Sequence, residues 1–143
     1  MDRTSFRKTL TKTLIIKYFL IVLLTLTSCK NQTCKGIEYK NAMSFKNGSP
    51  FSGTCINHHT NGEIRSIQNY KNGYDHGNWE FFYRNKKIKV KGKFNMGEKD
   101  GKWTYFHENG ILHKEHFYEN GKKTGVWKTF DETGDMSSLT TIP

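Results

Sequence analysis

The side chains best suited to chemistry in this 143-residue chain are six histidines, three cysteines and scattered carboxylates. On a strand, adjacent His58 and His59 would point to opposite faces, and so would His113 and His116, which are three residues apart. Neither pair therefore converges on a metal ion. No carboxylate is flanked by the apolar groups that would raise its pKa, and the sequence has neither a nucleophile motif nor a phosphate-binding loop. We therefore expect a non-enzymatic protein with no catalytic residue, metal or cofactor.

Cys29 follows an apolar segment near the start of the chain. Residues 1–17 contain five Lys or Arg, and residues 18–28 are uncharged and mostly apolar. This order is typical of a secretory signal. The apolar run has roughly half of the 20 or so residues that a membrane-spanning helix needs. Residues 26–29, Leu-Thr-Ser-Cys, resemble the lipobox of bacterial lipoproteins.

The lipobox resemblance implies a lipoprotein signal peptide over residues 1–28, cleavage between Ser28 and Cys29, and a lipid on Cys29. The acyl chains would supply the membrane affinity, at about 0.8 kcal/mol per buried CH₂. We expect a protein anchored in the bacterial cell envelope, in the periplasm or at the outer membrane if the host has two membranes. Loss of the signal lowers the formal net charge from +10 to +6, because residues 1–28 hold five basic residues and one Asp. A moderate charge on an exported protein does not point to nucleic acid.

Cys34 and Cys55 are the two cysteines that lipidation leaves over. In an oxidising compartment disulfides persist, so we expect these two to pair. The bond would close a loop of about 22 residues, worth roughly 3 kcal/mol in the chain-entropy model. No C-x-x-C spacing exists that would support zinc binding or thioredoxin-like chemistry.

A 24-residue repeat organises the chain after residue 45. Six columns of residues recur in one register, which is very unlikely by chance. The columns are Gly53, Gly77, Gly101 and Gly125; Cys55, Trp79, Trp103 and Trp127; Phe82, Phe106 and Phe130; Tyr70, Phe94 and Tyr118; Gly73, Gly97 and Gly121; and Ile64, Ile88, Leu112 and Met136.

Each repeat is expected to be a β-hairpin. Asn-Gly pairs such as those at 61–62 and 109–110 lie between runs rich in aromatic and β-branched residues, which predicts type I′ turns with positive φ at both central residues. A two-residue loop at 85–86 would set Trp79 opposite Gly92, with the indole covering the glycine, and Tyr83 opposite Ile88. The expected strands are 54–60, 63–71, 78–84, 87–95, 102–108, 111–119, 126–132 and 135–142, with one more within 36–46. Alternation then places Trp79, Phe81, Tyr83, Ile88, Val90 and Phe94 on one face, and Lys87, Lys89, Lys91 and Lys93 on the other.

The units resemble the variant MORN repeat. The resemblance is carried by Gly101-Lys-Trp-Thr-Tyr-Phe-His-Glu-Asn-Gly110, by Tyr118-Glu-Asn-Gly121 and by the lead-in Ser49-Pro-Phe-Ser-Gly53. The layout is similar to that of YwqK-type antitoxins, many of which are lipoproteins. The resemblance covers roughly residues 45–142 and implies an all-β antiparallel meander of repeated hairpins. Cys55 departs from the pattern at a Trp position, and Lys86 departs from it at a turn glycine.

The expected organisation is therefore a signal peptide over 1–28, a lipidated N-terminus and lead-in strand over 29–44, and a repeat domain over 45–143. The aromatic columns are expected to be the core of the sheet or a partner-binding face, with core favoured for the Trp column. The candidate face comprises Trp79, Phe81, Tyr83, Trp103, Tyr105 and Trp127. Two functions fit. One is an envelope interaction module, such as an antitoxin-like or immunity-like protein that masks an unknown protein partner; the other is a structural lipoprotein that holds an assembly at the membrane surface.

Overall fold

The structure is a computed structural model that describes residues 32–143. The expected signal peptide, its cleavage site and the lipid attachment at Cys29 lie outside the described residues. Between residues 32 and 143, no helix is long and apolar enough to cross a membrane. The described chain is built from β-strands and turns, so the expected all-β class is confirmed.

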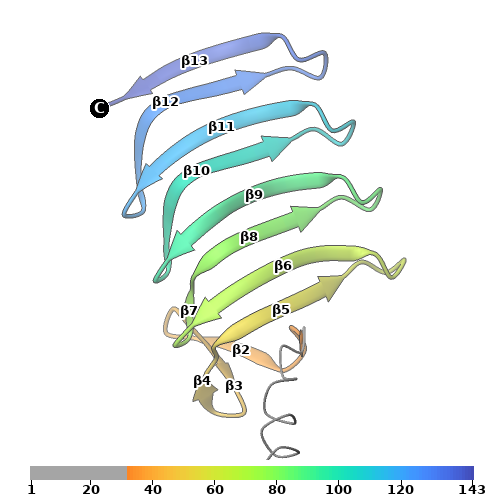
Figure 1. Ribbon diagram of the computed structural model, residues 1–143, viewed down its shortest axis with the longest axis vertical. Helices are drawn as coiled ribbons and strands as arrows, with labels where there is room; N and C mark the ends of the chain where they lie inside the picture. Colours follow the sequence, from red (N-terminus) through yellow and green to blue (C-terminus); the bar gives the residue numbers. More distant parts are fainter. Residues whose placement is uncertain (1–31) are drawn as a thin grey trace, which may run out of the picture. The chain divides into compact units, whose positions relative to one another are not determined.

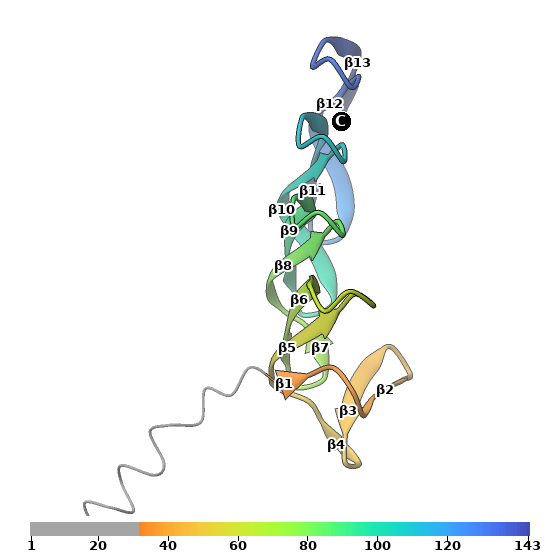
Figure 2. The ribbon, with the colours of Figure 1, turned by 90° about the vertical axis from the view of Figure 1, so that its right-hand side faces the viewer.

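The strands form two sheets (Figure 1). Their bounds are β1 Gln32–Thr33, β2 Ile37–Lys40, β3 Met43–Lys46, β4 Ser49–Pro50, β5 Gly53–His58, β6 Ile64–Lys71, β7 Tyr74–Asp75, β8 Gly77–Phe82, β9 Ile88–Asn95, β10 Glu98–Phe106, β11 Leu112–Glu119, β12 Lys122–Phe130 and β13 Met136–Ile142. The large sheet has the order β1-β5-β6-β8-β9-β10-β11-β12-β13, with β7 beside β6, and the small sheet has the order β2-β3-β4. From β5 to β13 the chain runs as an antiparallel meander, as expected. Seen from the side, this meander is one layer thick (Figure 2).

The lead-in segment is more elaborate than the single strand expected within 36–46. It forms the β2–β3 hairpin, in which Lys40 pairs with Met43 across a two-residue turn. Both turn residues, Asn41 and Ala42, have positive φ values, 51° and 58°. Ala is a poor residue for this conformation, so this turn could not be predicted from its residue types. β1 also pairs with β5, in the parallel sense.

The turns at 61–62, 85–86, 109–110 and 133–134 are not of type I′, so this prediction is wrong. At the second of them, the Lys86 N–H donates to the Tyr83 carbonyl at 3.1 Å, and the Tyr83 N–H donates to the Lys87 carbonyl at 2.9 Å. Lys86 has φ 69°, whereas Asn85 is not among the positive-φ residues. This is a three-residue loop that ends in a left-handed bulge residue.

The type I′ turns lie at the other end of the hairpins. Asn72-Gly73, Met96-Gly97 and Asn120-Gly121 have positive φ at both residues. In each case the flanking residues pair directly, as Asn95 does with Glu98. Asn-Gly is compatible with both kinds of turn, because each kind needs a left-handed residue at the glycine.

The register is as expected in the middle of the β8–β9 hairpin and different near its turn. Trp79 pairs with Gly92 and Phe81 with Val90, but the ladder then shifts and Phe82 pairs with Ile88. The same shift occurs in the other hairpins. It pairs Phe106 with Leu112 and Phe130 with Met136. Because paired residues share a face, Ile88 joins the Phe82 column, and the predicted pair of Ile88 with Tyr83 is wrong.

Lys86→Gly should stabilise the protein. A non-Gly residue in the left-handed region costs roughly 1–2 kcal/mol, of which about 1 should be recovered after the extra backbone entropy of glycine. The substitution also removes the ion pair of Lys86 Nζ with Glu63, which is exposed and worth little. Lys86→Ala is the matched control, since it removes the same ion pair and keeps the strain. If thermal unfolding shows the two variants to be equally stable, strain at this turn is not significant.

Candidate interaction surfaces

An aromatic spine runs along one face of the large sheet and holds the repeats together. Its members, with neighbouring ring centroids 4.9 to 6.5 Å apart, are Phe51, Tyr70, Trp79, Phe94, Trp103, Tyr118 and Trp127. Each tryptophan also donates its indole N–H to a main-chain carbonyl ten residues earlier, as Trp79 does to Asn69 at 2.9 Å and Trp103 to Lys93 at 3.1 Å. The spine therefore satisfies the polar end of each indole while burying its apolar part.

Trp103 shows how a single-layer sheet buries a large ring. Asp100 pairs with Lys93 and Thr104 with Lys91, so three residues of β10 span the single Gly92 of β9. The indole of Trp103 lies directly on Gly92, where a Cβ would come within 3.0 Å of three ring atoms. The glycine is therefore covered by Trp103 of the following repeat and not by Trp79, as its pairing had indicated.

Lysine side chains cover the outer side of this spine. Lys99 Nζ lies 4.3 Å from the ring centroid of Trp103 and 5.0 Å from that of Tyr118. It also donates to the Tyr105 hydroxyl at 3.4 Å. In the next repeat Lys123 Nζ lies 4.7 Å from the Trp127 centroid. Cation–π contacts of this kind keep the ammonium in solvent while the stem covers the ring.

The candidate aromatic face is consequently core at its centre. Trp79 and Trp103 are only 8% and 3% exposed, so they cannot contact a partner as an open patch. Trp127, Phe81 and Tyr105 are half-buried. This burial agrees with the core interpretation favoured for the Trp column, because each ring packs against the neighbouring repeats. A partner contact through Phe81, Tyr83 and Tyr105 stays a prediction.

Tyr83 makes contacts that the alternation of side chains along its strand did not predict. Its hydroxyl donates to the Phe106 carbonyl of the next repeat at 2.8 Å. Lys89 Nζ, expected on the opposite face, lies 5.4 Å from its ring centroid. The histidines at the equivalent positions, His59 and His107, direct Nε2 to the carbonyls of the next repeats at 3.0 Å. This column therefore links successive hairpins at their turn ends.

His113 and His116 are used in packing. His116 stacks on Trp127 with ring centroids 3.7 Å apart, and His113 lies 4.1 Å from His107. Burial lowers the pKa of His116, and the nearby lysines Lys114 and Lys123 lower it further. Across residues 32–143, no group of three or more His, Cys, Asp or Glu is arranged to hold a metal ion.

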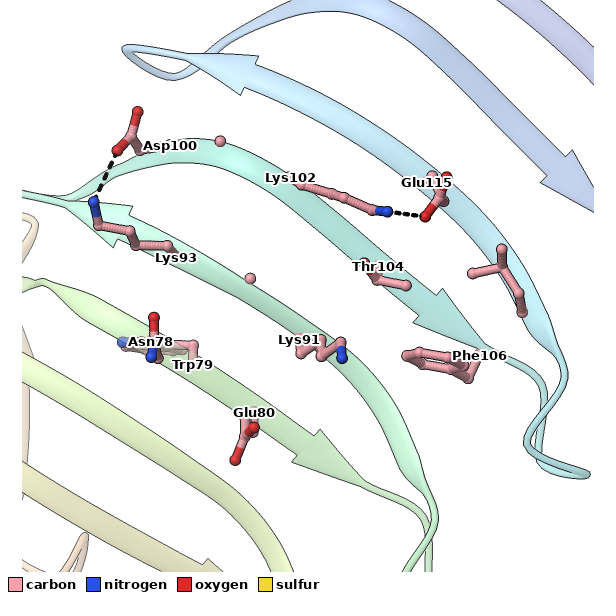
Figure 3. Close-up of a pocket in the computed structure, with 13 residues that line it drawn as sticks. Asn78, Trp79, Glu80, Lys91, Lys93, Asp100, Lys102, Thr104, Phe106 and Glu115 are labelled. Atoms are coloured by element: carbon pink, nitrogen blue, oxygen red, sulfur yellow. Dashed lines mark hydrogen bonds and ion pairs between the residues drawn. The ribbon is translucent and has the colours of Figure 1, made fainter.

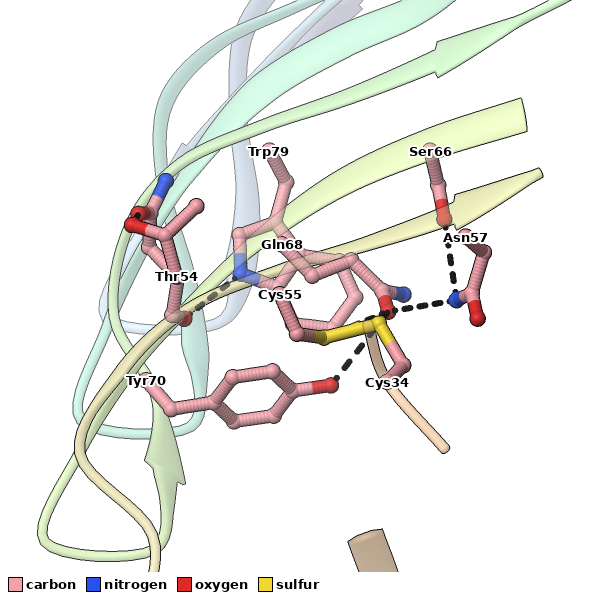
Figure 4. The surroundings of a disulfide bond; sticks show 9 residues. Cys34, Thr54, Cys55, Asn57, Ser66, Gln68, Tyr70 and Trp79 are labelled. Atoms are coloured by element: carbon pink, nitrogen blue, oxygen red, sulfur yellow. Dashed lines mark hydrogen bonds between the residues drawn. A yellow bond between two sulfur atoms is a disulfide. The ribbon is translucent and has the colours of Figure 1, made fainter. Parts of the chain in front are cut away.

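Cys34 and Cys55 form a disulfide at the N-terminal end of the large sheet (Figure 4). Their α-carbons are 4.9 Å apart, inside the range that the bond requires. Cys55 is fully buried and holds the place that tryptophan takes in later repeats. The bond therefore fixes β1 beside β5 where no earlier hairpin exists to cover a tryptophan. Nearby, burial and the charge of Asp75 raise the pKa of Tyr70 to about 12.

A groove of about 710 Å³ lies over strands β8 to β11 (Figure 3). We call it the Phe106 groove. Its lining residues are Asn78, Trp79, Glu80, Lys91, Gly92, Lys93, Asp100, Gly101, Lys102, Thr104, Phe106, Leu112 and Glu115. Phe106 and Leu112 form its apolar part, and Lys91 Nζ lies 5.7 Å from the Phe106 centroid. The charges around them have both signs: Lys93 pairs with Asp100 at 3.3 Å, and Lys102 pairs with Glu115.

Sequence reasoning identified Lys91 and Lys93 of this groove and missed Lys102 and the groove itself. The signal was present in the Phe82 and Ile88 columns, which recur with the same period as the tryptophans. Only the register shift near each turn brings these two columns to one face. The result is a second apolar stripe. Strict alternation from a two-residue turn would instead place the Phe82 and Ile88 columns on opposite faces.

These features define a class of protein, a single-layer antiparallel meander made of hairpin repeats that are joined by an aromatic spine. The comparisons agree with this class, because residues 52–72, 75–96 and 99–120 match the family model for the MORN repeat variant. These three segments are therefore similar to the MORN repeat variant. No curated protein was found to match the chain.

Proposed function

We propose that the protein is a non-enzymatic interaction module of the bacterial cell envelope, tethered by a lipid on Cys29, that binds a protein partner in the Phe106 groove. An antitoxin-like or immunity-like role, in which the module masks its partner, is one form of this function. The observation that carries the proposal is the groove, which joins half-buried apolar side chains to charges of both signs on one face.

The chemistry of the groove suits a protein segment with an apolar anchor between charged residues. Phe106 and Leu112 offer an apolar contact, and partner binding sites are commonly centred on such anchors. The ion pairs at the rim are partly exposed, so their net contribution to stability is small. Lysines and carboxylates at the rim can therefore exchange their present contacts for a partner's charges, which favours specificity and orientation.

The tether would act together with the groove. Two residues lie between Cys29 and Gln32, where the first strand begins, so the three steps from one α-carbon to the other span at most about 11 Å. A lipid on Cys29 would thus hold the sheet next to the membrane surface. Confinement to a surface raises the effective concentration of the module for a partner on the same membrane, even when the groove binds weakly.

The test is cross-linking of the full-length, processed protein in cells, followed by recovery of what is attached to it. Lys91→Glu and Leu112→Ala should each reduce recovery of the cross-linked partner about tenfold, which corresponds to about 1.4 kcal/mol of binding free energy. Lys89→Glu is the matched control, because Lys89 lies on the same strand as Lys91 and does not line the groove. The β-sheet circular dichroism spectrum should be unchanged in all three variants.

Variants in the aromatic face test the alternative, in which the partner binds that face and not the groove. Phe81→Ala and Tyr105→Ala alter half-buried residues beside the spine and leave the groove intact. If these variants fold and lose the partner, while Lys91→Glu retains it, the partner binds the aromatic face and the groove assignment is wrong.

A further inference from the structure

β13 is the final strand of the large sheet, and within residues 32–143 no strand pairs with its outer edge. Figure 1 shows it at the end of the stack, with β12 on its inner side. All of its residues except Ile142 are exposed, and Met136 and Leu139 are each 57% exposed. An open edge presents free N–H and C=O groups that can pair with another chain.

The residues of β13 do nothing to prevent such pairing. Its sequence, Met-Ser-Ser-Leu-Thr-Thr-Ile, contains no charged side chain, whereas every strand from β6 to β12 holds at least one. Charged residues are a common protection of sheet edges. β5 at the other end of the meander is also uncharged, and it is covered by β1 and by the Cys34–Cys55 disulfide. Of the two uncharged terminal strands of the meander, β13 is the one left open in the described chain.

The order of residues along β13 is self-complementary. Apolar and hydroxyl side chains follow the pattern apolar, hydroxyl, hydroxyl, apolar, hydroxyl, hydroxyl, apolar, which reads the same in both directions. If two copies pair antiparallel about Leu139, then Leu139 faces its own counterpart and Met136 faces Ile142. Ser137 then faces Thr141, and Ser138 faces Thr140. Each position meets a residue of its own kind, and no charge faces a like charge.

We propose that β13 binds β13 of a second copy of this chain, in an antiparallel register centred on Leu139. Such an interface is two-fold symmetric and closed, so it yields a dimer and not a fibre. Pro143, which has no N–H, follows Ile142 and would lie opposite Asp135, so the register ends there on both sides. The Phe106 groove is lined by residues 78–115 and stays open in the dimer, so the inference does not depend on the proposed function.

The test places cysteines in β13 of the full-length, processed protein and examines it on a non-reducing gel. Leu139→Cys should give a covalent dimer, because directly opposed α-carbons in an antiparallel pair are about 4.5–5.5 Å apart, which a disulfide can bridge. Ser137→Cys should not, because its two copies would be offset by four residues, about 13 Å. Ser137→Cys combined with Thr141→Cys should restore the dimer. The wild-type chain, treated in the same way, shows how much dimer Cys29 gives.

Sedimentation of the wild-type protein in detergent provides a readout that does not depend on new cysteines. A dimer mass is expected, and Leu139→Lys should convert it to a monomer by placing two ammonium groups across the two-fold axis. The proposal is overturned if the wild-type protein is a monomer at about 100 μM, a concentration well above the dissociation constants of most specific dimers. Equal cross-linking of Leu139→Cys and Ser137→Cys, or linkage of Leu139→Cys to a different protein, would also overturn it.

Discussion

Gly92→Ala should lower the free energy of unfolding by about 3 kcal/mol, the upper range for overpacking of a tight site. The added Cβ would lie within 3.0 Å of three ring atoms of Trp103. Gly92 does not have a positive φ, so alanine suits its backbone and the loss comes from packing alone. Because Trp103 is held by Phe94, Lys99 and the carbonyl of Lys93, the ring has little freedom to move away. Urea unfolding followed by tryptophan fluorescence measures the effect.

Two further variants separate this clash from a general weakness of β9. Lys91→Ala removes an exposed side chain from the neighbouring position and should change stability by less than about 0.5 kcal/mol. Trp103→Ala should itself cost about 3–5 kcal/mol. In that background Gly92→Ala should cost almost nothing, because the ring that it would strike is gone. Additive losses in the double variant would contradict the contact between Trp103 and Gly92.

Loss of the Cys34–Cys55 bond should have the second large effect. Cys34→Ala opens a covalent loop with a sequence separation of 21, which should cost roughly 3 kcal/mol in the chain-entropy model and lower Tm by about 10 °C or more. The change should also expose the β1–β5 edge, where the Cys34 N–H donates to the Ile56 carbonyl at 3.3 Å. Thermal unfolding under oxidising conditions measures the loss.

Reducing agent is the matched control for this prediction. Reduction should bring the wild-type protein close to the stability of Cys34→Ala and should leave the variant itself unchanged. If Cys34→Ala and the wild-type protein had the same Tm under oxidising conditions, the lead-in segment would contribute nothing to the stability of the repeats.

The repeat made most of the sheet predictable. A constant period of 24 residues fixes which positions are equivalent, and the pairing of Trp79 with Gly92 and of Phe81 with Val90 follows from placing the turn near residue 85. The turn type was not predictable from Asn-Gly, because both kinds of hairpin turn in this protein put glycine in the left-handed region. That ambiguity has a large consequence, since the true turn shifts Ile88 to the other face.

The surfaces were harder to predict than the strands. Whether an aromatic column is core or contact surface depends on what covers it, and Trp103 is covered by residues from its own and the preceding repeats. Lys99, which completes that cover, occupies a position that holds Asp75 one repeat earlier and Lys123 one repeat later. A charged position of this kind does not indicate that its side chain covers the core. The Phe106 groove depends on the register shift, which is a property of the folded turn.

We propose that a lipid on Cys29 holds this repeat sheet at the membrane where it works. Intact mass spectrometry of the protein extracted from membranes tests it directly. We predict a chain that begins at Cys29 and carries the added mass of its acyl groups, and a Cys29→Ser variant that keeps its signal peptide and is not acylated. A mature chain that begins at another residue, or one recovered from the soluble fraction with an unmodified Cys29, would contradict the claim.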